Sequence, residues 1–265
     1  PMFEESVVPY LAALTSQVIC SQTVKVCGIG ESRAETMVKD LIEGQTNPTI
    51  ATYAKTGEVH IRVTANAGDR KTAMKLIKPM VKELKNRFGN NIYTTEEDTT
   101  LEKAVADLAL ANKLTITCAE SCTGGLLSAR LVNVPGISEV YKTGVVTYAN
   151  KAKRRLLGVK KSTLQKYGAV SEKTAEEMAK GAAVMFKADV AVAVTGIAGP
   201  DGGTAEKPVG LVYIACHVKG KTTVREYRFS GNRYKIRESA VSAALALMRE
   251  CILVYYSKVT FGKGE

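Results

Sequence analysis

The spacing of apolar and polar residues divides the chain into two regions that differ in pattern. In the first region it predicts strands at 22–27, 58–64 and 91–94 and helices at 3–14, 32–42 and 69–88. Ser32 is the expected N-cap of the second helix. Together these elements predict a small α+β domain in which helices pack on one sheet. The polar segment 94–99 is the expected end of this domain.

The second region has longer elements. Its pattern predicts helices at 100–111, 126–133, 173–187 and 232–256, with strands at 114–118, 144–148, 188–194, 211–218 and 222–229. A basic helix is expected after residue 148, and the last two strands form a hairpin. Helices that alternate with strands, plus one antiparallel hairpin, predict a three-layer α/β/α domain with a mixed sheet. We therefore expect two domains, residues 1–95 and 96–265.

Composition agrees with a globular protein of two domains. The chain has 265 residues, of which 45% are apolar and 24% are charged. The longest apolar run is far shorter than the ~20 residues that cross a bilayer, and no signal peptide is recognisable. A cytoplasmic protein without a membrane partner is expected. Because the chain begins at Pro1 without an initiator methionine, we expect a fragment of a longer protein.

Cysteine and histidine usage argues against a metal site. The six cysteines form no C-x-x-C pair, and His60 and His217 are the only histidines. We expect the cysteines to be small buried apolar side chains in a reducing cytosol. His217 lies within an apolar alternation, where a core or surface role is expected.

Most of the net charge of +11 lies in the second domain. Residues 1–95 carry 12 Lys and Arg against 9 Asp and Glu, whereas residues 96–265 carry 25 against 17. Basic residues cluster at 151–155 and 160–161. Such a run is usually a solvated helix face. It would also raise the local concentration of a small phosphorylated substrate.

The turn at residues 121–125 is the first candidate for chemistry. A short strand runs into Ser121, Cys122 and Thr123, and Gly124 and Gly125 then precede a helix. Free backbone N–H groups converge at such a helix start, and glycines let an anion or carboxamide approach the backbone. An N-cap formed by Ser121 or Thr123 is the alternative interpretation.

A second glycine-rich loop, 195–203, also follows a buried strand. Ligands of open α/β sheets bind at the carboxyl ends of strands, so both loops are expected at one site. The chain has no G-x-S-x-G motif, so Ser121 would need a base other than histidine. A lysine serves where burial or nearby cations lower its pKa, and Lys153 has three cationic neighbours in sequence. Tyr148 is a candidate proton relay.

Six motifs in this order resemble the CinA C-terminal family, the nicotinamide mononucleotide deamidases also called PncC. They are A-E-S-C-T-G-G (119–125), T-Y-A-N-K-A-K (147–153), G-A-V-S (168–171), T-G-I-A-G-P-D-G-G (195–203), K-P-V-G (207–210) and S-G-N-R-Y-K-I-R (230–237). The resemblance covers about residues 100–256. Residues 1–95 resemble the KH-type middle domain of full-length CinA, with 1–14 like the tail of its preceding molybdopterin-binding-like domain.

The resemblance implies hydrolysis of nicotinamide mononucleotide to nicotinic acid mononucleotide and ammonia, a step of pyridine nucleotide salvage, without metal or organic cofactor. It implies Ser121 as nucleophile, with Lys153 and Tyr148 as base and relay. Backbone amides of the turn would stabilise the oxyanion. The substrate-binding residues it implies are Glu120, Thr123, Gly124, Gly125, Thr195, Gly196, Ala198, Arg233 and Arg237. One of the two arginines is expected to bind phosphate, because a guanidinium matches phosphate bidentately.

The spacing of residues in the sequence does not exclude a second candidate nucleophile. Cys122 adjoins Ser121, and Glu120, Lys153 and Cys122 would form the carboxylate–lysine–cysteine set of another amidase class. The resemblance favours Ser121.

The alternative hypothesis belongs to another class of function. In it, the first domain binds nucleic acid and the deamidase domain is inactive. Residues 28–31 resemble a G-x-x-G loop, and five lysines (71, 75, 78, 82 and 85) form a stripe along one predicted helix. The acidic Glu31 and the small net charge oppose it, so nucleic acid is not an expected partner. Pyrophosphatase activity is not expected, because the domain that would carry it is mostly absent. The resemblance also implies a homo-oligomer, most simply a dimer.

Overall fold

The fold is described by a computed structural model over residues 2–13 and 17–261. The chain divides into two compact units, Pro1–Thr99 and Thr100–Glu265. The boundary expected after residue 95 falls in the polar segment just before this division. Across the described ranges, no helix has both the length and the apolar character needed to cross a membrane.

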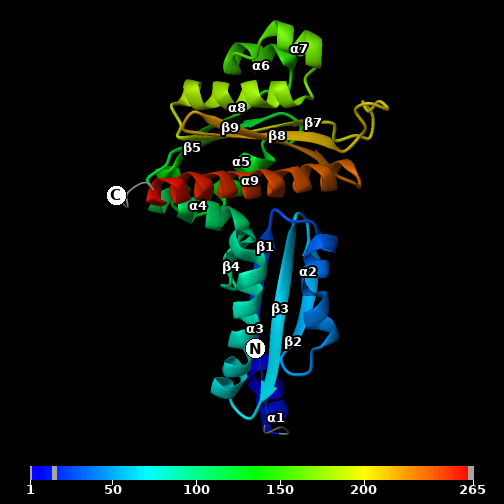
Figure 1. Ribbon diagram of the computed structural model, residues 1–265, viewed down its shortest axis with the longest axis vertical. Coiled ribbons are helices and arrows are strands. Elements are labelled where there is room, and N and C mark those ends of the chain that lie inside the picture. The colour runs from blue at the N-terminus through cyan, green and yellow to red at the C-terminus, as the bar shows by residue number, and fades with distance from the viewer. Residues whose placement is uncertain (1, 14–16, 262–265) are drawn as a thin grey trace. The chain divides into compact units, whose positions relative to one another are not determined.

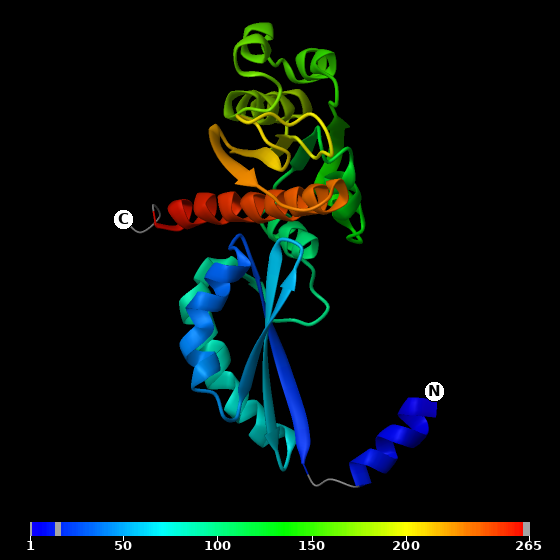
Figure 2. The ribbon, with the colours of Figure 1, turned by 90° about the vertical axis from the view of Figure 1, so that its right-hand side faces the viewer.

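The first unit contains a four-stranded antiparallel sheet with α2 and α3 on one face (Figure 2). In spatial order its strands are β2 (Thr49–Lys55), β3 (Glu58–Ala67), β1 (Val18–Cys27) and β4 (Ile92–Thr94). Its helical elements are η1 (Phe3–Val7), α1 (Val8–Ala13), α2 (Glu31–Glu43), α3 (Arg70–Phe88) and the short turn η2 (Gly89–Asn91). The core forms where alternate residues of β1 and β3, such as Val24 and Ile61, meet Ile77 and Leu84 of α3.

The N-caps of the two main helices in this unit differ from each other, and one of them differs from the prediction. Asp69 caps α3 by accepting a 2.9 Å hydrogen bond from the Thr72 N–H. The prediction that Ser32 caps α2 is wrong. That helix begins one residue earlier at Glu31, with Gly30 as its N-cap and no side-chain cap. Ser32 therefore lies inside the first turn.

The lysine stripe lies on the exposed face of α3. All five lysines are exposed, while Ala73, Ile77, Val81 and Leu84 are buried against the sheet. Residues 28–31 connect β1 to α2, and Gly28 has the left-handed φ of +72°. Nothing in this arrangement identifies a ligand, so nucleic-acid binding stays the untested alternative.

The second unit contains a five-stranded mixed sheet, as predicted. In spatial order its strands are β6 (Tyr141–Val146), β5 (Ile116–Glu120), β7 (Val190–Gly196), β8 (Leu211–Val218) and β9 (Lys221–Arg228). The first three are parallel, and β8 and β9 form the antiparallel hairpin. β5 and β7 therefore end at the same edge of the sheet.

Helices cover both faces of this sheet and complete the three layers (Figure 1). On one face lies α8 (Glu172–Phe186), with α6 (Asn150–Leu157) and α7 (Lys161–Tyr167) packed outside it. On the other face lie α9 (Arg233–Phe261), α4 (Leu101–Ala111) and α5 (Leu126–Val132). The short turn η3 (Ile137–Glu139) precedes β6.

Small residues bring α8 close to its neighbours. Its buried face is mostly alanine, including Ala175, Ala179 and Ala182, and it packs on Ala191 and Ala193 of β7. A Cβ atom on Gly181 would lie 1.8 Å from the Leu157 carbonyl oxygen, so only glycine fits there. This close packing fixes the end of α6, the helix that carries Lys153.

Candidate active site

The residues singled out from the sequence converge at the carboxyl ends of β5, β6 and β7. A cavity of about 220 Å³ opens there. It is lined by Ser121, Cys122, Tyr148, Lys153, Ala169, Val170, Thr195, Gly196, Ala198 and Arg233. Because β5 and β7 are adjacent parallel strands, the Ser121 turn and the 195–203 loop lie side by side.

Two glycines shape the turn that presents Ser121. Gly124 and Gly125 have φ values of +60° and +97°, in the left-handed region that disfavours other residues. Ser121 is anchored at the strand end, because its N–H donates to the Val194 carbonyl at 3.0 Å. Within the described residues, the N–H groups of Cys122 and Thr123 donate to no backbone carbonyl. Of these two residues, Cys122 lines the cavity and Thr123 is fully buried.

Glu120 lies beneath the turn and does not line the cavity. Its fully buried carboxylate accepts hydrogen bonds from the N–H groups of Gly125, Leu127 and Ser128, at 2.9, 3.1 and 2.9 Å. The Ser128 hydroxyl also donates to it, at 2.6 Å. The carboxylate therefore caps the start of α5, where the helix leaves its first amides without partners. It holds the turn in place, and the contact with substrate that the resemblance implied stays a prediction.

Ser121 and Lys153 are in direct contact. The Lys153 Nζ atom lies 2.9 Å from Ser121 Oγ, and both side chains are buried, with exposed fractions of 1% and 8%. Nζ also donates to the carbonyl oxygens of Thr147 and Tyr148, at 2.8 and 3.1 Å. A neutral amine has two N–H bonds and one lone pair. The ammonium form of Lys153 donates its third N–H to Ser121 Oγ. In the neutral form, with both N–H bonds kept on the two carbonyls, the lone pair faces the Ser121 hydroxyl.

Burial lowers the pKa of Lys153 to about 8. Removal from water disfavours the charged ammonium, and the Cys122 thiol opposes this effect only in part. The neighbours Lys151, Arg154 and Arg155 are exposed and do not contribute. Of the two causes considered from the sequence, burial is therefore the one that acts. With this pKa, about a tenth of Lys153 is neutral at pH 7.

Tyr148 lines the cavity, but its hydroxyl does not reach the Ser121–Lys153 pair. The side chain is 63% exposed, and Arg233 donates to its hydroxyl at 3.3 Å. Its contact with Lys153 is made by the backbone carbonyl. The ring forms part of the cavity wall beside Arg233.

Cys122 is poorly suited to act as a nucleophile. Burial raises the pKa of its thiol to about 12, so the reactive thiolate is scarce at neutral pH. Its carbonyl oxygen accepts a 3.0 Å hydrogen bond from Arg237 Nε. The electrostatics of the site thus favour Ser121 over the alternative that spacing left open.

The two arginines occupy different positions. Arg233 lines the cavity and donates to the Gly199 carbonyl at 2.7 Å. Arg237 does not line it, since its guanidinium donates to the carbonyls of Cys122 and Thr123, at 3.0 and 2.6 Å. Arg233 is therefore placed to meet a ligand, whereas Arg237 braces the Ser121 turn.

The loop after β7 supplies the opposite wall. The Thr195 hydroxyl donates a 2.8 Å hydrogen bond to the carbonyl of Ala169, which also lines the cavity. A Cβ atom on Gly196 would lie 2.6 Å from Val212 Cγ2, so glycine lets this loop pack on β8. Ala198 completes the wall. Ala169 and Val170 also line the cavity, and their only signal in the sequence is the G-A-V-S motif.

Thr123 is fully buried and does not line the cavity. Within the part of the chain that the structure describes, its hydroxyl has no hydrogen-bond partner. Its contribution to the site is made by its backbone carbonyl, which accepts a hydrogen bond from Arg237.

Comparison with known proteins agrees with this architecture. Residues 98–252 match the CinA C-terminal domain, and residues 21–94 match the damage-inducible protein CinA KH domain. The chain belongs to the CinA family. It is 52% identical over 253 residues to a Clostridium beijerinckii protein named as competence-damage inducible, covering 96% of this chain and 62% of that protein. A CinA-like protein of Dictyoglomus turgidum is 50% identical, with 96% and 61% covered. The chain thus spans about three fifths of these relatives.

Solved structures resemble the second unit. A CinA superfamily protein from Klebsiella pneumoniae is 38% identical with a TM-score of 0.56, and the match covers 58% of this chain and 96% of that one. A competence/damage inducible protein from Agrobacterium tumefaciens is 41% identical with a TM-score of 0.55, covering 60% and 99%. None of the names of these related proteins says which reaction, if any, the protein catalyses.

Proposed function

We propose that the second unit hydrolyses the carboxamide of nicotinamide mononucleotide, giving nicotinic acid mononucleotide and ammonia. The observation that carries the proposal is the buried Ser121–Lys153 contact, at 2.9 Å and with a lysine pKa of about 8. A hydroxyl held against a neutral amine is an activated nucleophile for acyl transfer. The substrate is inferred from the family motifs and from the position of Arg233 in the cavity wall.

In the proposed first step, Ser121 Oγ attacks the carboxamide carbon while Lys153 accepts the hydroxyl proton. The oxyanion that develops is stabilised by backbone N–H groups of the Ser121 turn, of which Cys122 lines the cavity. In comparable sites one such donor lowers the barrier by about 3–4 kcal/mol. The Lys153 ammonium then returns the proton to the carboxamide nitrogen, which leaves as ammonia.

In the second step, the neutral Lys153 deprotonates a water molecule that attacks the ester on Ser121. The ester C–O bond breaks, nicotinic acid mononucleotide is released, and Ser121 regains its proton. One water is consumed for each ammonia formed. Burial of Lys153 serves both steps, because a base is most efficient when its pKa lies near the working pH.

The direct test is to incubate the chain with nicotinamide mononucleotide and to measure ammonia and the nucleotide product by liquid chromatography and mass spectrometry. The proposal expects ammonia and nicotinic acid mononucleotide in equal amounts. Free nicotinamide with ribose phosphate would mean cleavage of the glycosidic bond instead. Either that result or a complete lack of product would contradict the proposal.

The rate is expected to depend on pH through Lys153. The neutral amine is the active base, so kcat/KM should rise with pH and level off above the lysine pKa of about 8. At pH 7 about a tenth of the lysine is neutral, which predicts a roughly tenfold gain from pH 7 to the plateau. A profile measured between pH 6 and 10 checks this. A flat profile, or one still rising at pH 10, would contradict it.

Arg233 is expected to bind the substrate phosphate. Removing a charge-assisted hydrogen bond costs about 1.5–3 kcal/mol, so Arg233→Ala should raise KM for nicotinamide mononucleotide about 10- to 100-fold. Nicotinamide riboside, which lacks the phosphate, should be turned over almost equally by the parent and the variant. Lys235→Ala removes an exposed cation from the same helix and serves as the control. An equal loss with both substrates would show that Arg233 does not select phosphate.

A further inference from the structure

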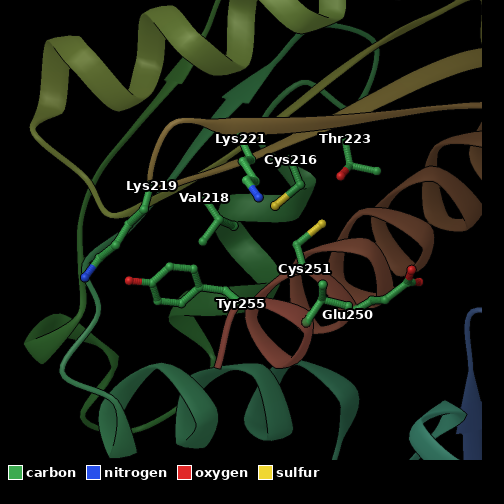
Figure 3. A pocket seen from close by; sticks show the side chains of 9 residues that line it. Cys216, Val218, Lys219, Lys221, Thr223, Glu250, Cys251 and Tyr255 are labelled. Carbon is green, nitrogen blue, oxygen red and sulfur yellow. The ribbon is translucent and has the colours of Figure 1, made fainter. Parts of the chain in front are cut away.

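A second cavity in the same unit holds two cysteines that face each other. It measures about 400 Å³ and lies between the β8–β9 hairpin and the second half of α9. Figure 3 shows the side chains of Cys216, on β8, and Cys251, on α9, next to each other in this cavity. The two cysteines are 35 positions apart in the sequence, so only the fold brings them together. None of the residues that line this cavity lines the candidate active site.

The two thiols differ in access to solvent. Cys216 is 1% exposed and sits within the sheet, where it pairs with Val192 of β7 and Thr223 of β9. Cys251 is half-buried on the helix that forms the other wall. A small reagent entering the cavity therefore reaches Cys251 first, and Cys216 lies behind it.

Hydrogen bonds within the cavity favour a thiolate at Cys251. Hydrogen bonding to Cys216 and Thr223 lowers the pKa of Cys251, whereas the hydrogen bond to Cys251 and burial raise the pKa of Cys216. The charge of Glu250 opposes the thiolate, and that of Arg225, which donates hydrogen bonds to both Glu250 carboxylate oxygens, favours it. The pair thus combines an accessible nucleophile with a buried neutral thiol.

We propose that Cys216 and Cys251 form a reversible dithiol–disulfide site that is oxidised by hydrogen peroxide. The position of both sulfurs in one cavity, with Cys251 accessible and Cys216 behind it, assigns Cys251 as the attacking residue and Cys216 as the resolving residue. This pairing is typical of redox-sensing thiols, which lie next to a second cysteine. Disulfides in reducing compartments are usually transient ones of this kind.

The reaction balances in two steps. The Cys251 thiolate attacks one peroxide oxygen, the O–O bond breaks, and Cys251 becomes a sulfenic acid while hydroxide leaves and takes up a proton. The Cys216 sulfur then attacks the Cys251 sulfur, the S–O bond breaks, and the proton of Cys216 leaves with the hydroxide as water. Two electrons pass from the two sulfurs to one peroxide, which becomes two waters. A dithiol reductant reverses the change.

The test is peroxide treatment of the chain, followed by alkylation, tryptic digestion without reductant and mass spectrometry. We expect a disulfide-linked pair of the peptides that contain Cys216 and Cys251, with the loss of two free thiols, both reversed by dithiothreitol. Cys20 is the internal control. It is half-buried too, but the other cysteine of its unit, Cys27, lies seven residues along the same strand, or about 23 Å away. Cys20 should therefore stay free.

Two variants separate the roles of the pair. In Cys216→Ser, Cys251 should stop at a sulfenic acid that dimedone captures, because no thiol resolves it. In Cys251→Ser, Cys216 should remain a free thiol at the same peroxide concentration. Thermal melts followed by circular dichroism establish that both variants fold. Absence of the linked peptide in the parent, or equal oxidation of Cys216 with and without Cys251, would overturn the proposal.

Discussion

Replacing Lys153 by methionine is expected to lower kcat for nicotinamide mononucleotide by about 10²- to 10⁴-fold, the usual contribution of a general base. Methionine fills the same buried space but has no lone pair to accept the Ser121 proton. Lys153→Arg is expected to fail as well, because a guanidinium stays protonated. Steady-state kinetics measure both effects, with thermal melts to show that the fold persists.

The exposed Lys151, on the same helix, provides the matched control. Lys151→Met removes the same charge without touching the site, so its kcat should stay within about twofold of the parent, as for substitutions that leave the transition state untouched. An active Lys153→Arg variant would contradict the role of Lys153 as a base. It would show instead that a positive charge beside Ser121 is sufficient.

Glu120→Ala is expected to have the largest effect on stability. The buried carboxylate accepts three backbone N–H bonds and one hydroxyl bond at the start of α5. Removing it leaves the buried Leu127 N–H and the half-buried donors of Gly125 and Ser128 without this acceptor, and each buried unsatisfied donor costs about 1–3 kcal/mol. We expect the free energy of unfolding to fall by at least about 3 kcal/mol in urea titrations.

The control is Glu139→Ala, which removes an exposed carboxylate from the same unit. Surface substitutions of this kind change stability by about 0.5 kcal/mol or less. If Glu120→Ala were as stable as Glu139→Ala, the carboxylate would not hold the turn. Its assignment as a positioning residue would then be wrong, and a direct contact with substrate would become the better interpretation.

The elements that position the site could be predicted because their patterns are strong. The apolar run before Ser121 and the apolar spacing after Gly125 marked β5 and the start of α5. The strand β2 was missed, since only Ile50 of its seven residues is buried and an edge strand of this kind shows little alternation. The helix α7 was missed for a similar reason, because Thr163 is its single buried residue.

Roles within the site were harder to predict than its position. Arg233 and Arg237 are four residues apart on one helix, and only the fold shows that the first lines the cavity and the second braces the turn. Glu120 ends an apolar strand, where sequence alone does not distinguish a cap from a ligand contact. The pKa of Lys153 is lowered by burial. The sequence did not predict this burial, because the residues around Lys153 in the chain are charged.

We propose Ser121 as the nucleophile of an amidase. The most direct test of this role is to measure ammonia release from nicotinamide mononucleotide. The parent should release ammonia, and Ser121→Ala should lose about 10⁴-fold or more in kcat, as when other hydrolases lose their serine. Cys122→Ala, the adjacent matched change, should retain the rate within about tenfold, or 1.4 kcal/mol of barrier. Turnover that survives in Ser121→Ala but is lost in Cys122→Ala would contradict the account.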